Sequence, residues 1–249
     1  MLLGTMRTSY DTIGVNYSDL RKPDSRIEMV ISKALGTAKT VLNVGAGTGS
    51  YEPTDRSVTA IEPSIEMIRQ RSALAAPVMQ GYAENLPFDD NSFDASTAIL
   101  TVHHWADKEK GLKEMRRVTR RQVVILTFDP LHRGFWLADY IPELVKLDEV
   151  QIPRMTDFEE WLGPVETTPV PIPHDCTDGF LGAYWRRPAA YLDPKIRTAI
   201  SCFWAVDNVS AALKKLASDL NSGAWAQRYS ELLDLDEYDF GYRLVTTKC

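Results

Sequence analysis

The chain has 249 residues, of which 44% are hydrophobic and 25% are charged, as is typical of a water-soluble globular protein. A net charge of -6 disfavours a broad nucleic-acid surface, because neutralising phosphates requires clustered Lys and Arg, so a small-molecule partner is expected. The three cysteines show no disulfide or metal-ligand spacing, and no apolar run forms a signal peptide or reaches the roughly 18 residues of a membrane span, so we expect a cytoplasmic protein without metal or membrane anchor.

The first part of the chain, residues 24–128, alternates signals for helices and strands. Ser25 and Glu28 form a capping box, an apolar repeat at helical spacing follows, and Gly36 is a good stop, which predicts a helix over 24–35. Short apolar segments predict buried strands near residues 40–44, 58–61, 77–80, 94–100 and 122–128. Further helices are expected over 64–71 and, capped by Asp107, up to Val118. This order predicts an α/β fold with a doubly wound, mostly parallel sheet.

A glycine-rich turn, GAGTG, follows the first predicted strand. Gly45, Gly47 and Gly49 have no Cβ, so the backbone there can adopt positive φ and lie directly against a ligand. Glu62 ends the next strand and offers two acceptor oxygens suited to a ribose diol. The turn and the acid together fit either a dinucleotide or S-adenosylmethionine, since both contain adenosine.

The residues that follow the turn, Ser50 and Glu52, distinguish between these two candidate ligands. A dinucleotide fingerprint has a third glycine at position 50, followed by a helix that receives a pyrophosphate, whereas this chain has Ser50 and Glu52. A carboxylate at that helix start would repel a diphosphate but would tolerate an ammonium and a sulfonium. The chain also lacks a Tyr-x-x-x-Lys pair after the predicted sheet. An NAD(P)-dependent oxidoreductase is therefore the less favoured alternative.

A basic run, residues 108–121, contains seven Lys or Arg. Leu112, Met115 and Val118 follow one helical face within it, and acidic residues dilute the charge. The pattern favours a solvated helix face over a nucleic-acid surface.

The composition changes after Phe128. Prolines gather between residues 164 and 173, an alternating strand is expected over 170–174, helices are expected to start at Asp193 and near Asp207, and a last strand is expected over 242–247. Most of the aromatic residues, including five of the six Trp, lie in this part. They fit either the core of a helical subdomain or an aromatic-walled substrate cap inserted before the last strand.

Four segments of the first half resemble a known family in their order and spacing. They read VLNVGAGTGSYEP, AIEPS, GYAENLPFDDNSFDAS and AILTVHHW, and an upstream segment, YDTIGVNYSDLR, also recurs in such proteins. This region is similar to class I S-adenosylmethionine-dependent methyltransferases of the type 11 (ubiquinone/menaquinone biosynthesis-like) group. The resemblance implies a Rossmann-like, seven-stranded sheet with a helical cap before its last strand. It implies a lid segment (1–23), a cofactor-binding core (24–174 and 240–249) and a substrate cap (175–239).

The resemblance also implies where the cofactor lies. In the family, the backbone of the turn faces the methionine end, the acid binds both ribose hydroxyls, and the end of the fourth strand lines the methyl region. The lid brings an aromatic residue and an arginine towards the methionine carboxylate, although the arginine equally fits a surface salt bridge. Carried onto this chain, the cofactor-binding residues are Tyr17, Arg21, Gly45, Ala46, Gly47, Glu62, Pro63, Ala83, Glu84, Leu100 and His103.

Two positions depart from the family pattern. Asn43 stands where the family commonly has an acid, so it brings no charge to pair with the ligand ammonium. Tyr82 stands where an Asp often meets the adenine amino group. Adenine is then expected to be held by stacking and by the backbone N–H of Ala83.

Two histidines follow the fourth strand at the carboxyl edge of the sheet, where open α/β folds place their ligands. Because adjacent side chains on extended backbone point to opposite sides, we expect one of the two at most to face the reacting methyl group. His104 is the candidate general base. The alternative is that His103 and His104 only shape the wall of the cofactor pocket. Weaker candidates on the same edge are Asp129, His132, His174 and Asp175.

These observations predict an S-adenosylmethionine-dependent methyltransferase acting on O, N or C of a small, partly apolar acceptor. A non-catalytic protein that binds the same cofactor as a sensor or assembly partner remains an alternative. No nucleic-acid or membrane partner is expected.

Overall fold

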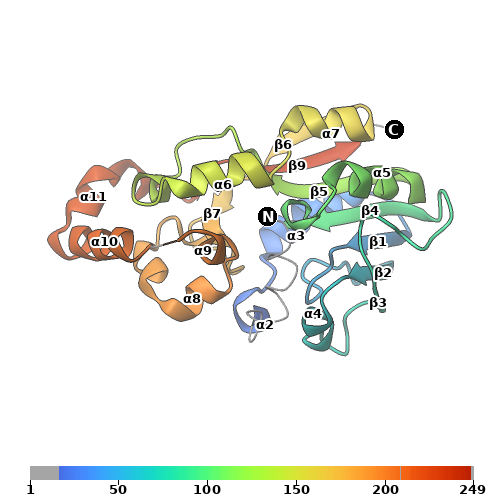
Figure 1. Ribbon diagram of the computed structural model, residues 1–249, viewed down its shortest axis with the longest axis horizontal. Helices are drawn as coiled ribbons and strands as arrows, with labels where there is room; N and C mark the ends of the chain where they lie inside the picture. Colours follow the sequence, from blue (N-terminus) through green and yellow to red (C-terminus); the bar gives the residue numbers. More distant parts are fainter. Residues whose placement is uncertain (1–16, 208, 248–249) are drawn as a thin grey trace.

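The computed structural model describes residues 17–207 and 209–247. Its centre is a seven-stranded sheet with the order β3-β2-β1-β4-β5-β9-β6 (Figure 1). The strands are β1 (Thr40–Val44), β2 (Ser57–Glu62), β3 (Val78–Gln80), β4 (Phe93–Ile99), β5 (Thr119–Phe128), β6 (Val165–Pro169) and β9 (Tyr242–Thr247). Strands β1 to β5 are parallel, while β9 is antiparallel to both β5 and β6. The predicted doubly wound, mostly parallel sheet is confirmed.

The helices follow the predicted order in the first half of the chain. The α-helices are α2 (Tyr17–Leu20), α3 (Ser25–Leu35), α4 (Ile65–Arg69), α5 (Lys108–Val118), α6 (Glu143–Gln151), α7 (Met155–Leu162), α8 (Pro194–Thr198), α9 (Cys202–Ala205), α10 (Ser210–Ser222) and α11 (Ala224–Arg228). The 3₁₀ helices are η1 (Val102–His104), η2 (Trp136–Asp139), η3 (Leu181–Tyr184), η4 (Pro188–Leu192) and η5 (Ser230–Leu232). No helix within the described ranges is long and apolar enough to cross a membrane.

Side chains at the predicted helix starts make the expected capping bonds. Ser64 Oγ accepts from Met67 N at 3.2 Å, and Asp107 Oδ1 accepts from Lys110 N at 3.0 Å. At the start of α3 the capping side chain is Asp24 rather than Ser25, and its Oδ1 accepts from Arg26 N at 3.0 Å. The helix boundary was therefore right and the predicted capping residue was wrong, because the chain offers two adjacent residues that can cap.

The sheet is covered on both faces because its strands are apolar on alternate sides. Val41, Val124 and Leu126 pack with α3 on one face. Leu42, Val44 and Ile125 pack with α5 and α7 on the other face. This double layer leaves the carboxyl ends of the parallel strands free to carry loops, which is where ligands bind in such sheets.

Two predicted elements differ in the structure. The turn after β1 leads through an irregular loop directly to β2, with no helix between residues 45 and 56. The strand expected over 170–174 is also displaced: the sheet strand is β6, and Ile172–Pro173 forms β7, which pairs with β8 (Glu237–Tyr238) in a separate ribbon. Strand β6 escaped prediction because an exposed, polar edge strand lacks the apolar alternation of a buried one.

A helical lobe extends beyond one side of the sheet, at the left of Figure 1. Among the described residues it consists of 130–152, 172–207 and 209–240. These ranges overlap the predicted cap, 175–239, and add the chain between β5 and α7. Aromatic rings hold its two segments together. Trp136 packs at ring-centroid distances of 5.6 Å from Tyr191 and 5.2 Å from Trp225, and its Nε1 donates to the Trp185 carbonyl at 2.7 Å.

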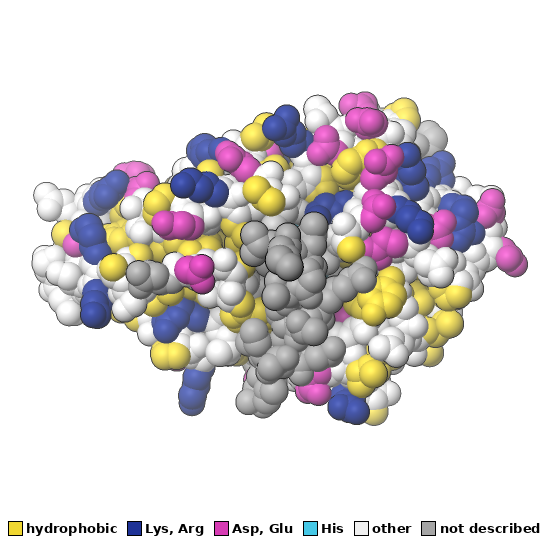
Figure 2. Space-filling view, viewed as in Figure 1, with side chains coloured by type: hydrophobic (Ala, Val, Ile, Leu, Met, Phe, Trp, Pro, Cys, Tyr) yellow, Lys and Arg dark blue, Asp and Glu magenta, His cyan; other side chains and the backbone are white. Residues whose placement is uncertain are grey.

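Charges of both signs are interspersed over the face shown in Figure 2. On α5, Lys113 pairs with Glu109 at 2.5 Å and Arg117 pairs with Glu114 at 2.7 Å, while Leu112, Met115 and Val118 are buried. Most of the basic run therefore forms the solvated face of an amphipathic helix, and its last two residues, Arg120 and Arg121, lie in β5.

Candidate active site

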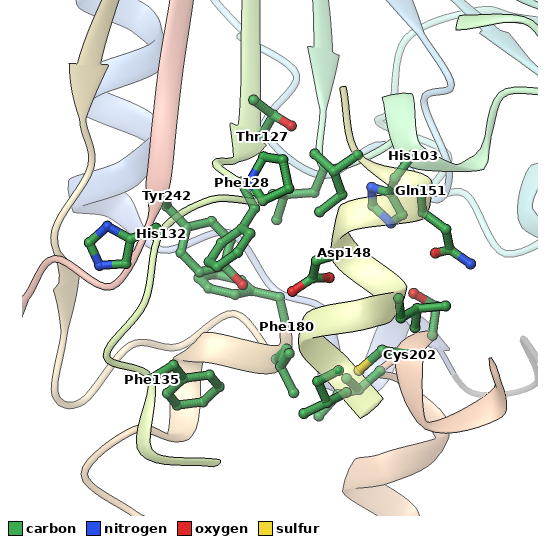
Figure 3. A pocket seen from close by; sticks show the side chains of 18 of the residues that line it. His103, Thr127, Phe128, His132, Phe135, Asp148, Gln151, Phe180, Cys202 and Tyr242 are labelled. Carbon is green, nitrogen blue, oxygen red and sulfur yellow. The ribbon is translucent and has the colours of Figure 1, made fainter. Parts of the chain in front are cut away.

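Two cavities adjoin at the carboxyl ends of the parallel strands. The glycine-loop cavity is lined by the turn after β1, the ends of β2 and β4, and the loop after β3; its lining includes Gly45, Ala46, Gly47, Glu62, Pro63, Tyr82, Ala83, Glu84, Leu100 and Thr101. The aromatic cavity lies between the sheet edge and the helical lobe (Figure 3); its lining includes His103, Phe128, Phe135, Asp148, Phe180, Cys202, Phe240 and Tyr242. Arg21, Leu100 and His104 line both cavities.

The glycine turn is anchored to β2 and pressed against the end of β4. Gly45 N and Ala46 N both donate to the Ile61 carbonyl, at 2.9 and 3.0 Å, and Gly45 and Gly47 have φ of +69° and +52°. A Cβ added at Gly45 would lie 2.2 Å from Thr101 Oγ1. The turn therefore requires glycine at position 45 for both its backbone angle and its close packing.

We expect Gly45→Ala to destabilise the protein by about 2 kcal/mol more than Gly163→Ala in urea unfolding. Both glycines have positive φ, but a Cβ at Gly163 meets nothing within 4 Å, so the comparison isolates the clash with Thr101. Equal losses in the two variants would show that the turn relaxes around the added methyl group.

Glu62 is buried at the end of β2 beside this turn. Its Oε2 accepts from Gly47 N at 2.8 Å and its Oε1 accepts from Ser64 N at 2.9 Å. Each carboxylate oxygen has more than one lone pair, so both can also accept from a ligand hydroxyl. The backbone thus orients the carboxylate before any ligand binds.

Glu52 does not face a ligand phosphate, contrary to the reason given above against a dinucleotide. It lies in a loop, and Arg71 Nη2 bonds both of its carboxylate oxygens, at 2.7 and 2.8 Å, in a buried pair. Asn43 Nδ2 donates to the same carboxylate at 3.1 Å, while Thr97 Oγ1 donates to Asn43 Oδ1 at 3.3 Å. Arg71 also donates to the Gly47 carbonyl at 3.1 Å, so this pair braces the glycine turn.

The residues that were predicted to hold the adenine ring, Tyr82 and Ala83, line the glycine-loop cavity. Tyr82 is 46% exposed and Ala83 is buried. Glu84 Oε1 accepts from Ala106 N at 2.8 Å and from Asp107 N at 3.1 Å, which ties the loop after β3 to the start of α5. An exposed ring beside a buried backbone segment provides a wall for a flat base.

Arg21 links the N-terminal segment to the helical lobe. Its Nε donates to Oδ1 of the fully buried Asp178 at 2.6 Å, and the Tyr51 hydroxyl donates to Asp178 Oδ2 at 3.0 Å. This pair joins residues 157 positions apart and is not a surface salt bridge. Tyr17 belongs to α2, but its side chain lies outside the described residues, as does Tyr10.

His103 and His104 lie side by side rather than on opposite sides of the chain. They belong to the 3₁₀ helix η1, not to extended backbone, and their ring centroids are 3.9 Å apart. His103 lines the aromatic cavity, whereas His104 lines both cavities. Burial, and then the positive charges of Lys108 and Arg21, lower the pKa of His103 to about 4. Burial also lowers the pKa of His104, followed by the charges of His103, Lys108 and Arg21. Both rings are therefore neutral near pH 7.

Among the weaker candidates, one lies in a cavity. His132 lines the aromatic cavity, with its Nδ1 at 3.3 Å from Arg243 Nη2. Asp129 Oδ1 accepts from Leu131 N at 3.0 Å, and Asp175 forms an exposed pair with Arg26. His174 is half-buried, with its Nδ1 at 3.1 Å from the Asp236 carbonyl oxygen.

Asp148, on α6, is a cavity residue that the sequence analysis did not single out. Figure 3 shows its carboxyl group among the aromatic side chains of the cavity. Burial in these apolar surroundings raises the pKa of Asp148 to about 7, against a smaller opposing effect of Arg133. A single Asp on a short helix, outside any motif, carries no signal in one sequence.

We expect Asp148→Asn to stabilise the protein above pH 7. The carboxyl pKa is about 7 in the folded state and near 4 in the unfolded chain, so the folded form loses stability as pH rises between these values. The amide avoids that cost, which is on the order of 2 kcal/mol after allowance for partial solvation. Urea unfolding at pH 5 and pH 8 tests this, since the gain must be larger at the higher pH.

Comparison with known proteins supports the reading of the glycine-loop cavity. A family model described as a methyltransferase domain, of the type 11 group, matches residues 42–127. The solved structure of a putative methyltransferase from an antibiotic biosynthesis pathway of Anabaena variabilis ATCC 29413 is 37% identical, with a TM-score of 0.85, over 92% of this chain and 99% of that chain. The chain belongs to the class I S-adenosylmethionine-dependent methyltransferases.

Other relatives of the family match less of the chain. The rice protein 2-methyl-6-phytyl-1,4-hydroquinone methyltransferase 2, chloroplastic, is 31% identical over 133 residues, which are 49% of this chain and 36% of that protein. Geranyl diphosphate C-methyltransferase of Streptomyces coelicolor is 14% identical with a TM-score of 0.53, over 89% of this chain and 78% of that chain, and so shares the fold. The chain spans about a third to a half of the length of the curated relatives that it matches first.

The cofactor of this family, S-adenosylmethionine, fits the residues of the glycine-loop cavity. The glycine turn lines the cavity with Gly45, Ala46 and Gly47, and a preoriented Glu62 supplies acceptors for a diol. Family membership also disfavours the nicotinamide alternative. That conclusion no longer needs the charge of Glu52, which Arg71 neutralises.

Proposed function

We propose that the protein transfers a methyl group from S-adenosylmethionine to a small acceptor whose apolar body lies in the aromatic cavity. The observation that carries the proposal is the junction of the two cavities at Arg21, Leu100 and His104. A cofactor in the glycine-loop cavity and an acceptor in the aromatic cavity would meet there.

The cofactor supplies an electrophilic methyl group on a sulfonium. Glu62 and the glycine turn hold its nucleoside and methionine parts, and Tyr82 and Ala83 flank the base. The lobe and the sheet edge exclude water and align the acceptor, and such alignment contributes much of the rate in a displacement of this kind. His104, neutral near pH 7 and at the junction, accepts the proton that an O- or N-nucleophile releases.

The acceptors of the relatives do not carry over to this chain. The family model ends at residue 127, before the helical lobe that supplies most of the aromatic cavity. A hydroquinone is therefore no better supported than another apolar acceptor. One protein of similar fold, 15% identical with a TM-score of 0.53, is named as the [4+2]-cyclase SpnF.

We further propose that residues 1–23 act as a lid and residues 175–239 as a substrate cap, in a cytoplasmic protein. The Arg21–Asp178 pair supports the first part, since it ties the N-terminal segment to the lobe over both cavities. The free thiols of Cys176 and Cys202 support the cytoplasmic compartment, because disulfides are rare there.

Purified protein incubated with methyl-labelled S-adenosylmethionine and a small-molecule cell extract tests the function. We expect a labelled small molecule, together with S-adenosylhomocysteine in equal amount. A Glu62→Ala variant, which loses the diol acceptor, serves as the control. Label no higher than in that control would contradict catalysis and favour a cofactor-binding protein without turnover.

A further inference from the structure

We propose that the acceptor carries a basic nitrogen and that Asp148 binds its ammonium form inside the aromatic cavity. The inference rests on the proposed function, because it names the substrate class of the same site. It makes Asp148 a residue that determines specificity.

Asp148 has no protein partner for its carboxylate among the described residues. The effects on its pKa are burial and the charge of Arg133, and they include no hydrogen bond. Arg133 itself is engaged elsewhere, since its guanidinium pairs with Glu149 and donates to the carbonyls of Pro130 and His132 at 2.8 and 2.9 Å. A carboxylate placed in an apolar cavity without a bonded partner is costly, and a cationic ligand would remove that cost.

Aromatic side chains line the cavity that holds this carboxylate, as Figure 3 shows. Phe135 and Phe240 stack at 4.9 Å, and Phe128, Phe180 and Tyr242 line the same space. Ring faces attract a cation but give no comparable gain to a neutral hydroxyl. Carboxylate and rings together therefore select an organic ammonium, in preference to a neutral alcohol of the same shape.

The other titratable groups around Asp148 do not compete for this role. Burial raises the pKa of both Tyr242, on β9, and Cys202, on α9, and the charge of Asp148 contributes to each shift, so both stay protonated near pH 7. The Tyr242 hydroxyl accepts from Gly182 N at 3.3 Å. Arg133 supplies the cation next to α6, and the second cation of the lining, Arg21, is paired with Asp178. His103, His104 and His132 also line the cavity.

The ammonium is distinct from the atom that is methylated. Asp148 lines the aromatic cavity and not the glycine-loop cavity, whereas the junction residues Arg21, Leu100 and His104 line both. A protonated nitrogen also has no lone pair to attack a methyl group. The acceptor thus has a nucleophile at the junction and a basic nitrogen towards the lobe.

Calorimetry with two matched probes, 4-phenylbutylamine and 4-phenylbutan-1-ol, tests this in the presence of S-adenosylhomocysteine at about pH 8. We expect the wild-type protein to bind the amine at least about 10-fold more tightly than the alcohol. Asp148→Asn should remove this preference, because the amide carries no charge to pair with the ammonium. Asp175→Asn, which makes the same charge change at an exposed site, should keep the preference.

Acidification provides a second readout. The amine remains protonated from pH 8 to pH 5.5, whereas Asp148 takes up a proton, so the preference of the wild type should fall as pH falls through about 7. Asp148→Asn should show no such fall.

Absence of amine binding, equal binding of the two probes, or an amine preference that survives in Asp148→Asn would overturn the inference. Because binding is measured without turnover, these outcomes are separate from a failure of methyl transfer. Labelled product without an amine preference would refute the inference alone. An amine preference without labelled product would refute the proposed catalysis alone.

Discussion

Replacement of Glu62 by Ala is expected to weaken S-adenosylhomocysteine binding by about 100-fold. Hydrogen bonds to a charged group contribute about 1.5 kcal/mol or more each, so two bonds to a ribose diol account for about 3 kcal/mol. The backbone N–H groups of Gly47 and Ser64 hold the carboxylate in place for these bonds. Titration calorimetry of the variant and the wild type measures the change.

Two variants make this result interpretable. Glu62→Gln keeps one acceptor oxygen and should lose affinity by an intermediate factor. Glu28→Ala removes an exposed carboxylate from α3 and should bind S-adenosylhomocysteine as the wild type does. Unchanged affinity in Glu62→Ala would mean that the ribose is bound elsewhere.

Replacement of Asp178 by Ala is expected to destabilise the protein by about 3 kcal/mol or more and to weaken cofactor binding. Asp178 is fully buried between Arg21 and Tyr51, and removal of one partner of a buried ion pair leaves the other charge uncompensated in its place. Arg21 and Tyr51 both line the glycine-loop cavity, so their displacement also disturbs the ligand. Urea unfolding and calorimetry give the two quantities.

The exposed pair between Arg26 and Asp175 is the matched control. Its side chains are 48% and 60% exposed, so Asp175→Ala should cost at most about 1 kcal/mol. A similar small loss in both variants would show that the Arg21–Asp178 pair does not hold the lobe to the N-terminal segment.

Several elements could be predicted because their signals are local. Helix α3 combines a capping residue, an apolar repeat and a terminal glycine within residues 24–36, and β9 has the predicted bounds, Tyr242–Thr247. The glycine turn was recognisable because glycine marks positions that can adopt positive φ. Glu62 was recognisable because an acid at the end of a predicted strand lies within the same short segment. Chain order then sufficed to predict a parallel sheet.

Other elements depended on residues distant in the chain. Glu52 was expected to oppose a phosphate, but Arg71, from the segment after α4, pairs with it. The two histidines were expected on opposite sides, but η1 brings their ring centroids within 3.9 Å of each other. Strand β6 is polar and exposed, so its place in the sheet follows from pairing with β9 and not from its own composition.

The amino-acid sequence thus determined the α/β core, the family and the nucleoside-binding turn, because helix caps, strand periodicity and glycine conformation act over a few residues. The tertiary structure decided the acceptor side. Asp178 meets Arg21 across 157 positions, and Asp148 acquires its raised pKa only when α6, α9 and β9 surround it with apolar side chains. Burial and long-range pairing arise from how elements pack, so no single segment of the sequence carries their signal.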